Sequence, residues 1–95
     1  MAKSYFDMNK FSITAEIHYI GKSEQITDKL SKQVIVLKSE ENNRVEYIPF
    51  DIYNDSVANL SVGSMVTVEF KLKGKASKND STKYFGSNQV IQILK

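Results

Sequence analysis

Apolar and polar side chains alternate along much of this chain, and that alternation predicts β-strands. In residues 11–19, Phe11, Ile13, Ala15, Ile17 and Tyr19 share one face. A period of two is typical of a strand with one face on a core. Four more stretches read as strands. They are a β-branched run, two alternating stretches and a last stretch that a glycine interrupts. The five predicted strands span residues 11–19, 33–37, 45–53, 66–73 and 83–94.

The segments between these strands are polar. Residues 22–31 have no helical stripe and are expected to form a loop or a loose hairpin. Asn42 and Asn43 tolerate left-handed geometry and predict a turn. One short helix is predicted within residues 54–60, because Asn54 or Asp55 can cap it and Gly63 follows its end.

The third strand has a clear division of faces. Ile48, Phe50 and Ile52 share one face, which we expect to be buried, and Pro49 on the other face indicates an edge or a bulge. Extending this reading to every strand gives a predicted core of Ile13, Ile17, Ile35, Leu37, Ile48, Phe50, Val68, Phe70 and Leu72.

Five strands with a single helix between the third and the fourth have the order of an oligonucleotide/oligosaccharide-binding (OB) barrel. An all-β OB-fold barrel is therefore the predicted fold, and a five-stranded meander or an SH3-like barrel is the competing interpretation. We expect residues 1–10 to be an N-terminal extension and residues 11–95 to be one OB-fold domain. Ninety-five residues leave room for a single domain.

Catalytic chemistry finds little support in the sequence. Cysteine is absent, and the one histidine, His18, cannot build a multi-histidine metal site. No phosphate-binding loop, dinucleotide fingerprint or nucleophile motif occurs. No apolar run is long enough for a membrane span. We therefore expect a cytoplasmic protein without enzymatic activity, cofactor, metal, small-molecule substrate or membrane partner.

Charge is distributed unevenly along the chain. Residues 1–63 carry seven basic and nine acidic side chains, whereas residues 64–95 carry six lysines against Glu69 and Asp80. Clustered lysines attract polyanions, although a lysine-rich hairpin can also be simply a solvated arm. Tyr84 and Phe85 follow the lysines, and one of the two must point outward. The predicted contacts on this hairpin are Lys71, Lys73, Lys75, Lys78, Lys83 and Tyr84.

The outward face of the second and third strands offers further contacts. Tyr47 and Tyr53 point outward on the third strand, and Lys32 and Lys38 lie at the two ends of the second. Nucleic acid crosses this face of an OB barrel, and its bases stack on aromatic rings beside basic grooves. The tyrosines could instead pack under the N-terminal extension or in a dimer contact.

From residue 11 to residue 93 the sequence resembles a family of short bacterial and phage OB-fold proteins. These proteins are treated as similar to single-stranded-DNA-binding proteins and are often catalogued as a domain of unknown function. The matching features are, in order, Lys32-Gln33 before Val36-Leu37, the strand Ile48-Pro49-Phe50-Asp51-Ile52-Tyr53, Val62-Gly63 before Val66-Thr67-Val68-Glu69-Phe70, Leu72-Lys73-Gly74, and Tyr84-Phe85.

The resemblance implies single-stranded DNA binding in bacterial or phage DNA replication, recombination or repair. By position it implicates Tyr47, Tyr53, Tyr84 and the hairpin lysines. The chain departs from cellular single-stranded-DNA-binding proteins in having no tryptophan and in ending Gln92-Ile93-Leu94-Lys95, without an acidic tip. The predicted function is single-stranded DNA binding with little sequence specificity. A homodimer is one form in which the protein could bind. The alternatives are a protein–protein or oligomerisation module and an RNA-binding OB fold.

Overall fold

Six β-strands make up most of the described chain in the computed structural model, which describes residues 10–54 and 60–94. None of these described residues is in a helix. The strands are β1 (Phe11–Ile20), β2 (Glu24–Thr27), β3 (Leu30–Glu41), β4 (Arg44–Tyr53), β5 (Met65–Ala76) and β6 (Tyr84–Leu94). All five predicted strands are present, and β2 is an additional short strand within the stretch expected to be a loop or loose hairpin.

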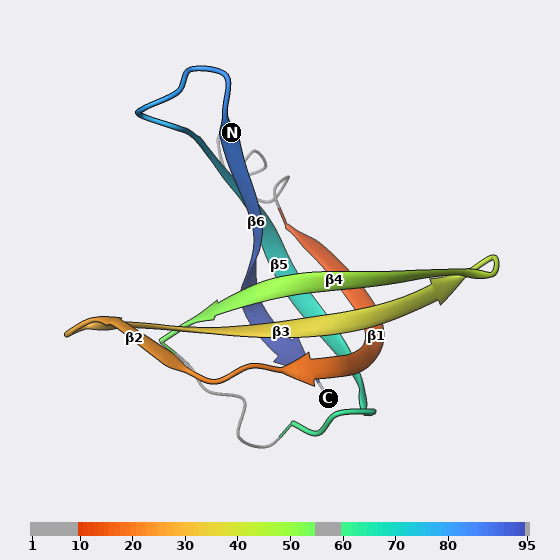
Figure 1. Cartoon of the computed structure of the whole chain (residues 1–95). Helices are drawn as coiled ribbons and strands as arrows, with labels where there is room; N and C mark the ends of the chain where they lie inside the picture. Colours follow the sequence, from red (N-terminus) through yellow and green to blue (C-terminus); the bar gives the residue numbers. More distant parts are fainter. Residues whose placement is uncertain (1–9, 55–59, 95) are drawn as a thin grey trace, which may run out of the picture.

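The strands form one curled sheet that closes on itself (Figure 1). Their order is β1-β5-β6-β4-β3-β2, and an additional β1–β3 pairing completes a barrel of five strands. Within the described part of the chain, the short β2 pairs with β3 alone. Every pairing is antiparallel except β4 with β6, which is parallel. This closed all-β barrel with its strand order confirms the OB fold.

The core lies inside the barrel and is built from the inward positions of all five barrel strands. Phe50 of β4 is its largest fully buried side chain, and its ring meets the Phe70 ring edge-on at a centroid distance of 5.0 Å. Of the predicted core, Ile13, Ile48 and Phe70 are partly buried and pack against the centre. The fully buried members of the predicted core are Ile17, Ile35, Leu37, Phe50 and Val68.

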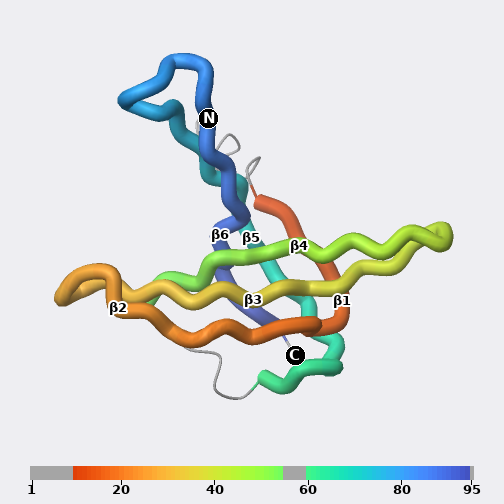
Figure 2. The backbone as a smooth tube through the Cα atoms, in the orientation of Figure 1, coloured from red at the N-terminus to blue at the C-terminus, as the bar shows by residue number. Residues whose placement is uncertain are grey.

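The prediction that Leu72 is buried is wrong, because its side chain is 51% exposed. The β1–β5 pairing ends where Phe11 meets Phe70. Among the described residues, β5 beyond Phe70 is paired with β6 alone, and the two strands continue as a hairpin, as the tube in Figure 2 shows. The alternation of apolar and polar residues therefore runs on past the end of the barrel.

The predicted alternation of residues 11–19, which puts Tyr19 on the same face as Ile17, does not hold at the end of β1. The β1–β3 register shifts between Ile17 and Tyr19, so that Tyr19 lies opposite Val36 and Ile20 lies opposite the buried Ile35. Such a bulge leaves one residue unpaired and turns the following side chains to the opposite face. Tyr19 is exposed as a result.

The expected helix at residues 54–60 is not seen. Residues 55–59 lie outside the described residues, and neither Asn54 nor Leu60 is helical. Asn54 has a positive φ of 58°, donates its backbone N–H to the Ser31 carbonyl and accepts the Ser31 N–H on Oδ1. These bonds fix the end of β4. The predicted N-terminal extension also lies outside the described residues, apart from Lys10, which pairs with Glu69 at 3.6 Å.

The sequence predicts a turn at Asn42 and Asn43 and an edge or a bulge at Pro49. Asn42 and Asn43 both have positive φ, as a two-residue hairpin turn between paired Glu41 and Arg44 requires. Pro49 does not lie in an edge strand, because β4 runs between β3 and β6. Among the described residues, however, β6 pairs with β4 only at Asp51, so proline's missing donor is tolerated here.

Candidate nucleic-acid interface

A corner forms on the outside of the barrel where β6 crosses β4. The two strands share the single register pair Asp51–Gln89, and the β5–β6 hairpin then rises away from the barrel (Figure 1). The Asn88 side-chain amide donates to the Pro49 carbonyl at 3.1 Å and ties the hairpin to β4. The outer end of β4 and one face of the hairpin therefore border the same space.

A hollow of about 460 Å³ occupies this corner. It combines side chains from three places in the sequence: the start of β3, the end of β4 and the β5–β6 hairpin. Four of the predicted contact residues line this hollow. It is also lined by Phe85, one of the two neighbouring rings between which the sequence does not decide, and by Asp51, which the sequence does not single out. The lining residues are Lys32, Asp51, Tyr53, Lys73, Gly74, Lys75, Phe85, Gly86 and Ser87.

The register of the hairpin decides which aromatic side chain enters the hollow. Phe85 lies opposite Lys75 and Tyr84 lies opposite Ala76, so the two rings point to opposite faces. Phe85 lines the hollow and is 55% exposed, whereas Tyr84 is 74% exposed on the other face. Of the two rings, it is therefore Phe85, and not the predicted Tyr84, that accompanies the lysines.

The electrostatic balance of the hollow is positive. Among the described residues that line the hollow, Lys32, Lys73 and Lys75 face one carboxylate, that of Asp51. Lys32 Nζ lies 3.8 Å from Asp51 Oδ1, and the Asp51 side chain is only 15% exposed. Lys71 continues the lysine row towards the barrel, opposite Gln89. The arrangement places cations beside two aromatic rings, which is what a groove for single-stranded nucleic acid needs.

A second hollow of about 220 Å³ adjoins the first, and Lys32 lines both. Tyr19 and Val34 provide its apolar wall. Its shape depends on Gly21, where an added Cβ would lie 2.9 Å from the Val34 carbonyl oxygen. Gln33 holds this turn by donating its side-chain amide to the Gly21 carbonyl at 2.7 Å. The sequence contains one sign that Tyr19 can face outward: Tyr19 and Ile20 are adjacent apolar residues, which breaks the strict alternation of β1.

The tip of the β5–β6 hairpin carries the remaining predicted lysines, Lys78 and Lys83, both exposed. Asp80 orders this tip, because its Oδ1 accepts hydrogen bonds from Thr82 Oγ1 at 2.6 Å and from the Thr82 backbone N–H at 2.9 Å. These two bonds, first that of the side chain and then that of the backbone, lower the pKa of Asp80 below its ordinary value. Both lysines lie outside the hollow.

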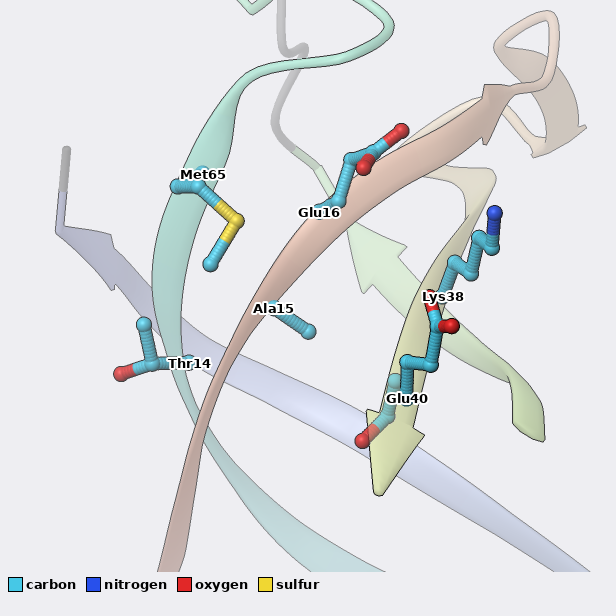
Figure 3. A pocket seen from close by; sticks show the side chains of 7 residues that line it. Thr14, Ala15, Glu16, Lys38, Glu40 and Met65 are labelled. Atoms are coloured by element: carbon cyan, nitrogen blue, oxygen red, sulfur yellow. The ribbon is translucent and has the colours of Figure 1, made fainter. Parts of the chain in front are cut away.

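Tyr47 and Lys38 lie at the opposite end of the β3–β4 face. Tyr47 is six residues from Tyr53, about 20 Å along the strand, and packs on His18 with ring centroids 4.8 Å apart. Lys38 lines a separate hollow that also contains Glu16 and Glu40 (Figure 3). Two carboxylates beside one lysine disfavour phosphate. The structure therefore separates Tyr47 and Lys38 from the other predicted contacts.

Metal-binding clusters and membrane-spanning helices are both absent from residues 10–54 and 60–94. Within them, no group of three or more His, Cys, Asp or Glu side chains could hold a metal ion. Over the same residues, no helix is long and apolar enough to cross a membrane.

Comparison with family models assigns the chain to a family. A model described as "Domain of unknown function (DUF3127)" matches residues 12–93, and the chain belongs to this family. The resemblance to a family of OB-fold proteins catalogued as a domain of unknown function is thereby confirmed. No curated protein matches the sequence.

Solved structures share the fold at low sequence identity. The N-terminal domain of PriB protein from Thermoanaerobacter tencongensis, described as a dimeric structure, aligns with a TM-score of 0.67 and 15% identity over 90% of this chain and 93% of that domain. A small single-stranded DNA binding protein from Mycoplasma pneumoniae aligns with a TM-score of 0.50 and 12% identity over 92% of each chain. At these identities the likeness shows the OB fold.

Proposed function

We propose that this protein binds single-stranded DNA with little sequence preference, through the hollow between β4 and the β5–β6 hairpin. The observation that carries the proposal is the meeting of Tyr53 and Phe85 with Lys32, Lys73 and Lys75 in one open hollow. Aromatic rings offer stacking surfaces to any base, and each stacked base contributes about 1–3 kcal/mol. Lysines supply a phosphate attraction that does not depend on sequence.

The remaining lysines extend this surface along the hairpin. Lys71 lies on the same side as Lys73 and Lys75, and Lys78 and Lys83 follow at the tip. The adjoining hollow with Tyr19 and Lys22 offers a continuation on the other side of Lys32. A strand of DNA entering between the rings would therefore find cations in both directions. Tyr84, Tyr47 and Lys38 do not line the hollow and lie outside the DNA-binding surface of this proposal.

The comparisons support the proposal in two ways. One structural relative is named as a single-stranded DNA binding protein, and the fold is one that binds oligonucleotides on this face. Binding, and not catalysis, is accordingly the role we propose, in bacterial or phage DNA replication, recombination or repair and hence in the cytoplasm. At identities of 12% and 15% these relatives share the fold, and it is the side chains of the hollow that favour DNA as the ligand.

A protein interface is the second candidate function. Exposed Tyr47 and Tyr19 on the outer face favour it, as does the dimeric structure of the PriB domain. The PriB relative also makes a homodimer a reasonable form of the DNA-binding protein. An apolar interface keeps its affinity as salt is raised, whereas phosphate binding weakens steeply.

The test is a titration of the full chain with labelled oligo-dT, a DNA duplex and single-stranded RNA at two salt concentrations, followed by fluorescence anisotropy. We expect oligo-dT to bind most tightly and to lose affinity strongly at the higher salt. Preferred binding of the RNA would support the RNA-binding alternative. Absence of binding to all three, together with a salt-insensitive dimer by sedimentation, would contradict the proposal and favour the protein interface.

A further inference from the structure

One side chain in the hollow does not fit a surface designed only to attract phosphate. Asp51 places a carboxylate in the hollow that Lys32, Lys73 and Lys75 also line, and its side chain is 15% exposed. A negative charge at this place repels the DNA backbone. Asparagine or threonine would fill a similar volume on β4 without that repulsion.

The contacts of Asp51 leave its carboxylate oxygens available. Its cation partner is Lys32, at a distance of 3.8 Å, which is too long for a hydrogen bond. Among the described residues no side chain or backbone group donates a hydrogen bond to this carboxylate. Tyr53 lies two positions along the same face of β4 and also lines the hollow. A ring held near Tyr53 would thus have an acceptor, Asp51, and a donor, Lys32, within its surroundings.

This acceptor and donor match a feature that all four bases share. The Watson–Crick edge of each base presents at least one N–H donor and one acceptor, and proteins that bind single strands read these edges when the bases are unpaired. In a duplex the same groups are occupied by the complementary base. The carboxylate then meets only phosphates, which it repels.

We propose that Asp51, together with Lys32, reads the Watson–Crick edge of an unpaired base stacked in the hollow and so sets the preference for single strands over duplexes. The proposal rests on the proposed function and adds a specificity-determining residue to it. Asp51 weakens binding to every polyanion through its charge, and it recovers this loss only when a free base edge donates a hydrogen bond to it.

Asp51→Asn tests the proposal, because it removes the charge and keeps the shape. The probes are a mixed-sequence oligonucleotide, the duplex formed with its complement and an abasic strand of the same length. We expect the variant to bind the duplex and the abasic strand more tightly than the unaltered protein does. Binding to the oligonucleotide should improve much less, so that its preference over the duplex falls by about fivefold or more.

Glu40→Gln is the matched control. It removes the same charge about 20 Å away along β3, in the separate hollow near Glu16. Its preference for the single strand should equal that of the unaltered protein. If thermal unfolding shows that Asp51→Asn is destabilised, Asp51→Thr makes the same test with a residue that suits strands.

The outcomes separate the two proposals. An oligonucleotide preference that stays the same in Asp51→Asn, while the unaltered protein binds DNA in a salt-dependent way, overturns the role of Asp51 and leaves the proposed function standing. An unaltered protein that binds none of the three probes overturns both.

Discussion

Two long hairpins project from the same barrel, and they differ in charge. The β3–β4 hairpin carries Glu40, Glu41 and Glu46 against Arg44, all exposed. The β5–β6 hairpin, with the loop at its tip, carries five lysines against Asp80. In both, two strands simply continue beyond the barrel as an antiparallel pair (Figure 1). The shared architecture therefore says little about function.

What separates the hairpins is the surface beside each of them. The lysine-bearing hairpin crosses β4, so its cations face Tyr53 across a hollow. At the base of the acidic hairpin, Tyr47 packs on His18, and the nearest hollow contains carboxylates. A polyanion is thus attracted to one hairpin and repelled by the other. The comparison teaches that a projecting hairpin becomes a candidate site only where charge and stacking surfaces coincide.

The largest expected effect is on stability, and it comes from a substitution in the barrel core that supports both hairpins. Phe50 is buried in β4 and touches Phe70 of β5, so Phe50→Ala opens a cavity between the two. We expect a loss of about 3–5 kcal/mol in the free energy of unfolding, measured by chemical denaturation. Val45→Ala on the exposed acidic hairpin should cost far less. A small loss from Phe50→Ala would mean that the barrel is not packed around this ring.

The next largest effect is on DNA affinity. Substituting an aromatic side chain should lower it beside the lysine-bearing hairpin and much less beside the acidic hairpin. Tyr53→Ala and Phe85→Ala should each weaken single-stranded DNA binding by about 1–3 kcal/mol in anisotropy titrations, because each removes a stacking surface from the hollow. Tyr47→Ala serves as the control and should weaken binding by less than about 1 kcal/mol. All three variants should melt at nearly the temperature of the unaltered protein. An equal loss from Tyr47→Ala would place the DNA along the whole β3–β4 face.

The smallest effect concerns the tip of the lysine-bearing hairpin. The hydrogen bonds from Thr82 lower the pKa of Asp80 below 3.8, so ionised Asp80 stabilises the folded tip at pH values above its ordinary pKa. This contribution is lost as the pH falls through the lowered pKa. In an acid titration followed by NMR, the Thr82 amide should shift with a midpoint below 3.8. Thr82→Val should move the midpoint back up, and an unchanged midpoint would mean that the side-chain bond is absent in solution.

Much of the barrel can be predicted from the sequence, because alternation reports directly which side chains face a core. Phe50 and Ile52 are buried on one face of β4 and Tyr47 is exposed on the other, as their positions predict. Alternation cannot report where the barrel ends, and it therefore predicts a buried Leu72 where the side chain is exposed. It also cannot reveal a bulge, since the extra residue at His18 moves Tyr19 outward without changing the composition.

The candidate site depends on features that act over longer distances. The sequence singles out Tyr53, Lys73 and Lys75, but it cannot show that they border one hollow, since this follows from the crossing of β4 and β6. The choice between Tyr84 and Phe85 depends on the hairpin register, which the loop at residues 77–83 sets. The sequence does not mark Asp51 as a site residue, because a lone carboxylate on a strand is ordinary until its neighbours are known.

The most direct test of the central claim compares the salt dependence of DNA binding in two charge variants. Lys73→Gln with Lys75→Gln removes two cations from the hollow, and Glu40→Gln with Glu41→Gln alters the acidic hairpin by the same number of charges. Each phosphate contact to a single strand contributes about −0.7 to the slope of log K against log salt. We predict that the lysine variant flattens the slope by up to about 1.4, while the glutamate variant leaves it unchanged. A slope that is the same in the lysine variant and in the unaltered protein would contradict the account.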